Sequence, residues 1–227
     1  CLQIWHRRVK MHISFDFDYT LADSSKGAII CANHALQTMG RPTCSDADIK
    51  KTIGLSLGET YRQLTNDLST TDISTFTTLF LQKADEVVVD CIKFYGSTKV
   101  VLGSLKEEDH FISIVSTKYS KRINAALVRD GLLPYIDVVI GGDLVDKQKP
   151  SPEGINKAVD LSKFKKEETF YIGDSKSDGL AAQAAGVGFI GVLTGMTPRE
   201  KLLEYGPVEV ISDLIELKAA IPEVPKI

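Results

Sequence analysis

Two aspartates, Asp16 and Asp18, stand close together in the segment HISFDFDYTL at residues 12–21. Apolar and polar residues alternate there with the period of a β-strand, so both aspartates lie on the same side of the chain. Neighbouring carboxylates repel each other unless a cation or a proton lies between them. Carboxylate oxygens are also the ligands that Mg²⁺ prefers. The segment fits a magnesium site and equally an edge strand with two solvated acids, so the later part of the chain must decide between them.

A second pair of acids, Asp174 and Asp178, lies in the segment GDSKSD at residues 173–178. The two residues are four apart at a predicted helix start, so they share one face of the helix. A plain helix also favours acids at its N-terminus, which is the alternative interpretation of this pair. Mg²⁺ takes one or two protein carboxylates together with phosphate and water oxygens. We expect Asp16 and Asp174 to be its direct carboxylate ligands.

Hydroxyl groups and a lysine follow two further predicted strands, as Ser116, Thr117 and Lys149. A carboxylate held beside a phosphate ester can attack phosphorus and form an aspartyl-phosphate. Ser116 and the Thr117 amide could donate to the phosphoryl oxygens, and Lys149 could supply a fixed positive charge. Asp18 has the reach to act as the general acid and base. Turn-forming residues and a surface lysine beside Lys147 remain the alternatives.

The elements that must position these residues alternate between strands and helices from residue 99 onward, which predicts a Rossmann-like α/β fold with a parallel sheet covered on both faces. Ligands of such sheets bind beyond the carboxyl ends of the strands. The acids, hydroxyls and lysine all follow successive predicted strands. Strands are predicted at residues 111–115, 137–140, 169–172, 187–192 and 208–211, and helices at 100–108, 121–130, 152–161, 176–185, 198–203 and 213–220.

Between the first strand and this alternating part, the apolar period changes from two to 3.6. Helices are predicted at about residues 23–39, 45–51, 59–68 and 72–94, with a flexible loop at 54–58 and no strand. The chain thus divides into an N-terminal extension at 1–10, an α/β core at 11–22 and 96–227, and an all-helical cap at 23–95 inserted after the first strand. The last residues, 221–227, are expected to form a loosely held tail.

The composition of the 227 residues, 43% hydrophobic and 25% charged, is that of an ordinary soluble globular protein. A net charge of -3 gives no support for a nucleic-acid partner, and no apolar run is long enough to span a bilayer. The four cysteines form no CxxC pair and favour free thiols in a reducing compartment, so we expect a cytoplasmic protein. The four histidines lack zinc-ligand spacing. A monomer or a weak homodimer is expected.

Together, the motifs resemble those of the haloacid dehalogenase superfamily of phosphohydrolases, in the branch with a helical cap after the first strand. They are DFDYT at residues 16–20, VST at 115–117, KP at 149–150 and GDSKSD at 173–178, in the order of the family. Phosphoglycolate phosphatase-like members and related pyrophosphatases are the most similar in pattern. The resemblance implies Mg²⁺ as the cofactor. It assigns the nucleophile to Asp16, acid-base catalysis and a backbone metal contact to Asp18, phosphate binding to Ser116 and Lys149, and metal binding to Asp174 with Asp178 close by.

Two positions bear on the substrate. Tyr19 stands where the family usually has glycine, and we expect its larger side chain to narrow the entry beside Asp18. The segment GLSLG at residues 54–58 resembles the substrate-facing loop of the family, and Leu57 stands where sugar-phosphate mutases tend to have an arginine. The absence of that arginine, together with Thr20, favours a phosphatase over a mutase. Leu57, Thr20 and Thr117 are therefore predicted to contact the substrate.

These observations predict a Mg²⁺-dependent phosphatase that acts on a small soluble phosphate monoester. Within the same superfamily, the alternatives are an inorganic pyrophosphatase and a sugar-phosphate mutase. Outside it, a phospho-accepting signalling domain also combines an acid pair, a hydroxyl residue and a lysine on a parallel sheet. A binding protein that has lost catalysis is a further alternative, although every expected catalytic residue is present.

Overall fold

Six parallel strands form the central sheet of the computed structural model, which describes residues 10–222. Their order is β5-β4-β1-β6-β7-β8, so β1 lies inside the sheet between β4 and β6. The strands are β1 (His12–Phe15), β4 (Phe111–Val115), β5 (Val138–Ile140), β6 (Thr169–Gly173), β7 (Gly188–Val192) and β8 (Glu209–Ile211). The predicted Rossmann-like α/β fold is confirmed. Predictions for residues 1–9 and 223–227 lie outside the described residues.

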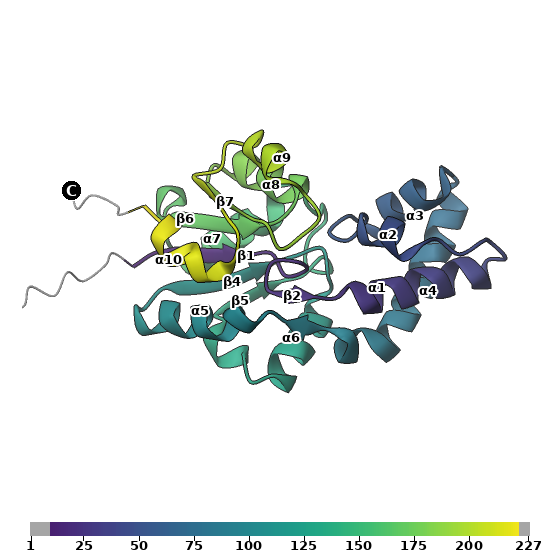
Figure 1. Ribbon diagram of the computed structural model, residues 1–227, viewed down its shortest axis with the longest axis horizontal. Helices are drawn as coiled ribbons and strands as arrows, with labels where there is room; N and C mark the ends of the chain where they lie inside the picture. Colours follow the sequence, from purple (N-terminus) through teal and green to yellow (C-terminus); the bar gives the residue numbers. More distant parts are fainter. Residues whose placement is uncertain (1–9, 223–227) are drawn as a thin grey trace, which may run out of the picture.

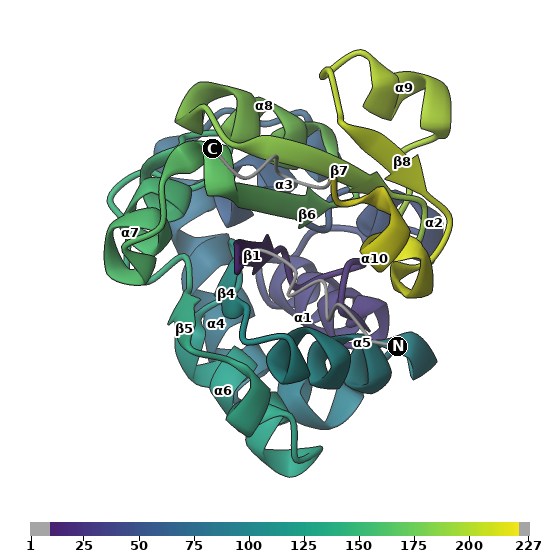
Figure 2. The same ribbon diagram turned by 90° about the vertical axis from the view of Figure 1, so that its left-hand side faces the viewer.

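Helices cover both faces of this sheet (Figures 1 and 2). One apolar cluster joins Phe15 and Ile114 to α5, α6 and α10, and a second joins Val115 and Tyr171 to α7, α8 and α9. Strands buried on both faces are expected to be almost continuously apolar, as β4 is with the sequence FISIV. The helices are α5 (Gly96–Glu107), α6 (Ser120–Arg129), α7 (Glu153–Ser162), α8 (Lys176–Ala185), α9 (Arg199–Leu203) and α10 (Leu217–Ala220), and the 3₁₀ turns are Leu133–Tyr135, Lys166–Glu168 and Leu214–Glu216. The helix predicted at 213–220 thus begins as a 3₁₀ turn.

Four further helices extend to one side of the sheet, where they pack around their own apolar cluster (Figure 1). They are α1 (Ser25–Thr38), α2 (Asp46–Lys50), α3 (Leu57–Thr65) and α4 (Thr70–Cys91). Helix α3 starts two residues earlier than predicted because Ser56 and Glu59 form a capping box at its N-terminus. Part of the predicted loop at 54–58 is therefore helical. The division of the chain into cap and core as separate folding units stays a prediction.

The prediction that residues 23–95 contain no strand is wrong. Strand β2 (Ala22–Asp23) pairs in antiparallel fashion with β3 (Lys93–Phe94) where the chain enters and leaves the four helices. Two residues are too few to show an alternating pattern, and the partner strand lies far away in the sequence. Next to this ribbon, the carbonyl oxygen of Leu21 accepts hydrogen bonds from the Tyr95 amide (3.1 Å) and the Thr98 hydroxyl (2.7 Å).

Two arginines of α6 form hydrogen bonds to α4 and so link that helix to the core. Buried Arg122 donates from Nη2 to Asp85 Oδ1 at 2.6 Å and to the carbonyl of Leu81 at 3.0 Å. Arg129 donates to the carbonyls of Val89 and Ile92 at the end of α4. The last carbonyls of a helix lack partners within the helix, so Arg129 supplies donors that α4 itself cannot.

Two predictions from composition can be compared with the described residues. Cys31, Cys44 and Cys91 are free thiols, as expected, whereas Cys1 lies outside the described residues. None of the helices within residues 10–222 has the length and apolar character that crossing a membrane requires.

Gly27 and Gly103 offer a matched test of how closely α1 packs on α4. A Cβ at Gly27 would lie 3.2 Å from Val88 Cγ2 and 3.3 Å from Cys91 Cβ, whereas one at Gly103 would meet only Tyr135, at 3.8 Å. Alanine is favoured over glycine within helices by roughly 0.5–1 kcal/mol, so we expect Gly103→Ala to raise the free energy of unfolding by that amount. Gly27→Ala should be less stable than Gly103→Ala by about 1–3 kcal/mol, because it overpacks the contact. Urea denaturation measures both, and equal gains would contradict the close packing.

Candidate active site

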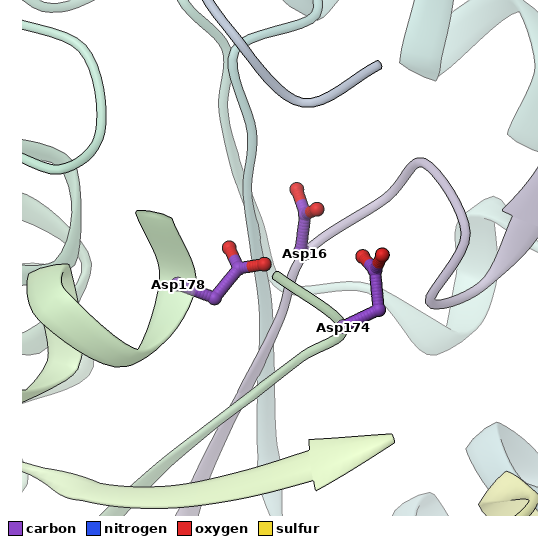
Figure 3. A group of neighbouring side chains, drawn as sticks. All are labelled: Asp16, Asp174 and Asp178. Atoms are coloured by element: carbon purple, nitrogen blue, oxygen red, sulfur yellow. The ribbon is translucent and has the colours of Figure 1, made fainter. Parts of the chain in front are cut away.

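The carboxyl ends of β1 and β6 bring three acids together: Asp16, Asp174 and Asp178 (Figure 3). One carboxylate oxygen of each residue lies within 4.8 Å of those of the other two. Asp16 directly follows β1, Asp174 directly follows β6, and Asp178 lies in the first turn of α8. All three are buried, with at most 5% of their surface exposed. The side chain of Asp18 is not part of this cluster.

Asp178 serves both α8 and the cluster. Its Oδ2 accepts hydrogen bonds from the Ser175 amide (2.9 Å) and hydroxyl (2.5 Å), which caps the N-terminus of α8. Its Oδ1 accepts a hydrogen bond from Lys149 Nζ at 2.5 Å. The two interpretations of this acid, a helix cap and a member of a polar site, therefore both apply.

Lys149 lies between the acids and is not the surface lysine of the alternative interpretation, since its side chain is only 3% exposed. Its Nζ lies 2.7 Å from Asp16 Oδ1 and donates to the hydroxyl of Tyr171 at 3.0 Å. The Tyr171 hydroxyl in turn donates to the carbonyl of Val115 at 2.7 Å. Tyr171 was missed in the sequence, although it lies two residues before Gly173 on the same face of β6 and could have been found from that spacing.

The electrostatics of the cluster favour a bound cation. Burial raises the pKa of Asp16 to about 7, against the opposing effect of Lys149. Burial, with Asp178 and Asp16 nearby, raises the pKa of Asp174 well above its usual value. Burial alone would lower the pKa of Lys149, but the carboxylates of Asp16 and Asp178 outweigh it and raise that pKa.

The three carboxylates of the cluster share one cation. Lys149 Nζ lies 2.7 Å from Asp16 Oδ1 and 2.5 Å from Asp178 Oδ1, and within residues 10–222 Asp174 forms no ion pair. Neighbouring buried carboxylates repel each other unless a cation or a proton lies between them. Clustered carboxylate oxygens are the donor set that Mg²⁺ takes. The residues present therefore fit a magnesium ion, which Asp16 and Asp174 would hold with Asp178 beside them.

Asp18 is held by two residues to which the sequence reasoning gave no role. Its Oδ1 accepts a hydrogen bond from the Ser24 hydroxyl and lies 3.2 Å from Lys118 Nζ. The turn after β1 brings Ser24 back to this point, with the Tyr19 amide donating to the carbonyl of Ala22 at 2.7 Å. Lys118 directly follows the motif at residues 115–117, and this place at a strand end was the signal that could have indicated its role.

Ser116, Thr117 and Thr20 occupy three different places. Ser116 follows β4 and its hydroxyl accepts a hydrogen bond from the Lys118 amide at 3.3 Å. The Thr117 hydroxyl donates to the carbonyl of Gly54, in the loop before α3, at 3.5 Å. Thr20 is fully buried, and its hydroxyl donates to Asp174 Oδ1 at 3.5 Å. Thr20 thus contacts a cluster acid, and its predicted contact with substrate stays a prediction.

A cavity of about 610 Å³ adjoins the acid cluster and separates the core from the four helices. Asp18, Thr117 and Lys149 line it from the core, and Leu57 lines it from α3. Tyr19 does not line this cavity. Its backbone has the left-handed conformation (φ 61°) that glycine adopts easily, which agrees with the glycine usual at this position. Its side chain is buried, at 7% exposure. Tyr19 therefore forms no part of the wall of this cavity, and its effect on the entry beside Asp18 stays a prediction.

Gly195, in the loop after β7, has no side chain and so leaves room for the carboxylate of Asp174. A Cβ at this position would lie 1.7 Å from Asp174 Oδ2 and 2.4 Å from its Cγ. Any other residue would push the carboxylate away from the cluster. No periodicity or motif of the sequence reasoning pointed to this role, because the close approach is between segments far apart in the chain.

The sequence model of the haloacid dehalogenase-like hydrolase family matches residues 13–192. A phosphoglycolate phosphatase of Vibrio parahaemolyticus is 28% identical over 216 residues, which cover 90% of this chain and 93% of the relative. Pyrophosphatase PpaX of Listeria welshimeri is 33% identical over 208 residues, covering 89% and 94%. The crystal structure of a haloacid dehalogenase-like hydrolase from Bacteroides fragilis superposes with a TM-score of 0.89 at 37% identity, covering 92% of this chain and 100% of that one. The chain belongs to the haloacid dehalogenase-like hydrolase family.

Gly195→Ala tests whether the position of Asp174 matters for metal binding. We expect the affinity for Mg²⁺ to fall roughly 10–100-fold, the range found when groups that orient metal ligands are changed. Isothermal titration calorimetry measures the affinity, and circular dichroism confirms that the variant is folded. Gly96→Ala is the control, because a Cβ there would meet nothing within 4 Å. Equal affinities of Gly195→Ala and the control would contradict the role of Gly195.

Proposed function

We propose that this chain is a Mg²⁺-dependent phosphatase that hydrolyses a small organic phosphate monoester through an aspartyl-phosphate on Asp16. The observation that carries the proposal is the buried contact of Asp16 with Lys149, 2.7 Å apart, beside a cavity that Asp18 also lines. A carboxylate beside a buried cation suits attack on an anionic phosphoryl group, because the lysine offsets the negative charge. The similarity to a protein named phosphoglycolate phosphatase supports the same reaction class.

In this mechanism the Asp16 carboxylate attacks phosphorus, and the bond between phosphorus and the leaving oxygen breaks. Asp18 gives a proton to the leaving alkoxide and then takes one from the water that attacks the aspartyl-phosphate, so phosphate and the Asp16 carboxylate are released. Lys149 and Ser116 bind the phosphoryl oxygens. Mg²⁺, held by Asp16 and Asp174, would supply further positive charge to the phosphoryl group.

The contacts of Asp18 suit the acid-base role. The Ser24 hydroxyl and Lys118 Nζ fix one carboxylate oxygen, so the side chain is held beside the cavity. An acid-base group must be within hydrogen-bond reach of the proton that it transfers, and a fixed side chain loses less freedom in reaching it. The predicted cytoplasmic location and the monomeric or weakly dimeric state belong to the same proposal.

A pyrophosphatase is the second candidate. It is favoured by the 33% identity to a protein named pyrophosphatase PpaX. The same residues would act on pyrophosphate, and the leaving group would be inorganic phosphate in place of an alkoxide. A panel of phosphate esters that also contains pyrophosphate separates the two candidates by their relative rates.

Asp16→Asn tests the nucleophile. We expect the release of phosphate from such a panel, in the presence of Mg²⁺, to fall by roughly 10³-fold or more, because the amide cannot attack phosphorus. Asp46→Asn, at an exposed position in the first turn of α2, is the matched control and should keep the activity. Hydrolysis by Asp16→Asn at the wild-type rate would contradict the proposal. A durable phosphate on Asp16 in the wild type would favour a signalling domain, and exchange of phosphate positions without release would favour a mutase.

The effect of Mg²⁺ on stability tests the metal site without using activity. A ligand that binds only the folded state stabilises it by about 2.7 kcal/mol at 100 times its dissociation constant. We therefore expect Mg²⁺ to raise the thermal midpoint of the wild type and of Asp46→Asn, but not that of Asp174→Asn. Differential scanning calorimetry with and without a chelator measures the shift. The same shift in Asp174→Asn would show that Mg²⁺ binds elsewhere.

A further inference from the structure

The cavity beside the acid cluster is large for a substrate of two carbons. Its volume is about 610 Å³, within the range of roughly 300–1,000 Å³ that is typical of pockets for drug-sized ligands. The catalytic residues occupy only its core side, with Asp18 and Lys149. The remaining space lies against the helices α1 to α4 and is available to the leaving group of a phosphate ester.

Large apolar side chains form much of the wall on that side, beside several hydroxyl groups. Large apolar side chains come from α2, from the loop before α3, from α3 itself and from α4: Ile49, Ile53, Leu55, Leu57, Phe80 and Leu81. These apolar side chains are stabilised by apolar ligand groups that leave water, and they themselves offer no hydrogen-bond partners to a ligand. Pyrophosphate and phosphoglycolate would leave most of this wall uncovered.

Four basic residues also line the cavity, and three of them pair with carboxylates of the protein. These pairs are Lys118 with Asp18 (3.2 Å), Arg122 with Asp85 (2.6 Å) and Lys149 with Asp16 (2.7 Å). The fourth, Arg62 of α3, forms no ion pair in the part of the chain that the structure describes. Arg62 comes from the side of the cavity opposite to the catalytic residues.

The acid nearest to Arg62 along α3 is engaged by another residue and does not pair with the arginine. Glu59, one turn earlier on α3, also lines the cavity, but its Oε2 accepts hydrogen bonds from the Ser56 amide (3.1 Å) and hydroxyl (2.8 Å). Glu59 is therefore engaged at the N-terminus of α3. The guanidinium group of Arg62, by contrast, has a planar set of donors that suits a carboxylate or a second phosphate.

We propose that this cavity is a leaving-group subsite for an organic phosphate monoester with an apolar body and an acidic group at its far end, which Arg62 binds. The inference rests on the proposed phosphatase activity and adds the substrate class to it. The phosphoryl group lies at Lys149, the apolar body lies along Leu57 and Phe80, and the acidic group pairs with Arg62. The reaction that supplies such a substrate must phosphorylate the hydroxyl group of an apolar hydroxy acid.

The test uses ω-carboxyalkyl phosphates from two to about eight carbons, each beside the alkyl phosphate of equal length that lacks the carboxylate, with Mg²⁺ present. For the wild type we expect kcat/KM to be highest for a chain longer than that of phosphoglycolate. The carboxylate should raise kcat/KM by about 10-fold over the ester that lacks it, because a hydrogen-bonded charge pair is gained. In Arg62→Gln this preference should disappear, while the esters without a carboxylate keep their rates.

Two variants complete this test of Arg62. Arg62→Lys keeps the charge without the fork of donors and should restore part of the preference. Lys51→Gln removes a positive charge from an exposed residue near the end of α2 that does not line the cavity, and it should behave as the wild type. Because the readout is a ratio for two esters of equal length, a general loss of folded protein does not change it.

Filling the cavity tests the apolar body separately. Ala28 of α1 lines the cavity and is half-buried, so Ala28→Leu adds volume there at a helix position that suits leucine. We expect kcat/KM for the long esters to fall about 10-fold, with little change for phosphoglycolate. Ala47→Leu, on the exposed side of α2, is the control.

Each outcome decides the inference. A carboxylate preference that survives Arg62→Gln, or rates that fall steadily with chain length in the wild type, would overturn the subsite while leaving the phosphatase intact. Hydrolysis of pyrophosphate far above that of every ester would likewise overturn it. If folded protein with Mg²⁺ released phosphate from no member of the series and from no other ester, the proposed phosphatase function itself would be wrong.

Discussion

The mutual repulsion of buried carboxylates is the constraint on which the rest of this structure depends. Asp16, Asp174 and Asp178 bring their oxygens within 4.8 Å of one another, where burial and proximity oppose ionisation. A single ammonium group, that of Lys149, lies against two of them. Such an arrangement persists only if the surrounding backbone cannot relax away from it. The cluster therefore needs a rigid support, and its excess of negative charge gives it an affinity for cations.

The parallel sheet and its hydrogen bonds supply that support. Asp16 is fixed by its amide, which donates to the carbonyl of Ile172 on the neighbouring strand at 2.8 Å. Tyr171 joins Lys149 to the carbonyl of Val115, so the lysine is attached to β4 as well as to the acids. Polar groups held in this way need little reorganisation when charge develops on a bound ligand. The donors and acceptors are thus set in place by the fold before any ligand arrives.

The sequence predicted those parts of the fold that depend on local pattern. The bounds of β4 and α8 agree with the predicted segments 111–115 and 176–185, and the rule for strand ends predicted that Asp16 and Asp174 would meet. The start of α3 could also have been predicted, because serine followed three residues later by glutamate is a capping signal. Contacts between distant segments that follow from no such rule could not be predicted, since one sequence shows no contacts. The β2–β3 ribbon, the fit of Gly195 against Asp174 and the single unpaired arginine of the cavity all belong to this second kind.

The β2–β3 ribbon shortens the loop that must close when β1 pairs with β4 during folding. Strands β1 and β4 pair although Ser14 and Ser113 are 99 residues apart, and closing so long a loop costs conformational entropy. The ribbon holds Ala22 beside Phe94, so the intervening helices leave and rejoin the core at one point. Once α1 has packed on α4, the loop that separates β1 from β4 is effectively short. The inserted helices therefore add little to the effective contact order of the sheet, and insertions of different length can occupy this position without changing the strand pairing.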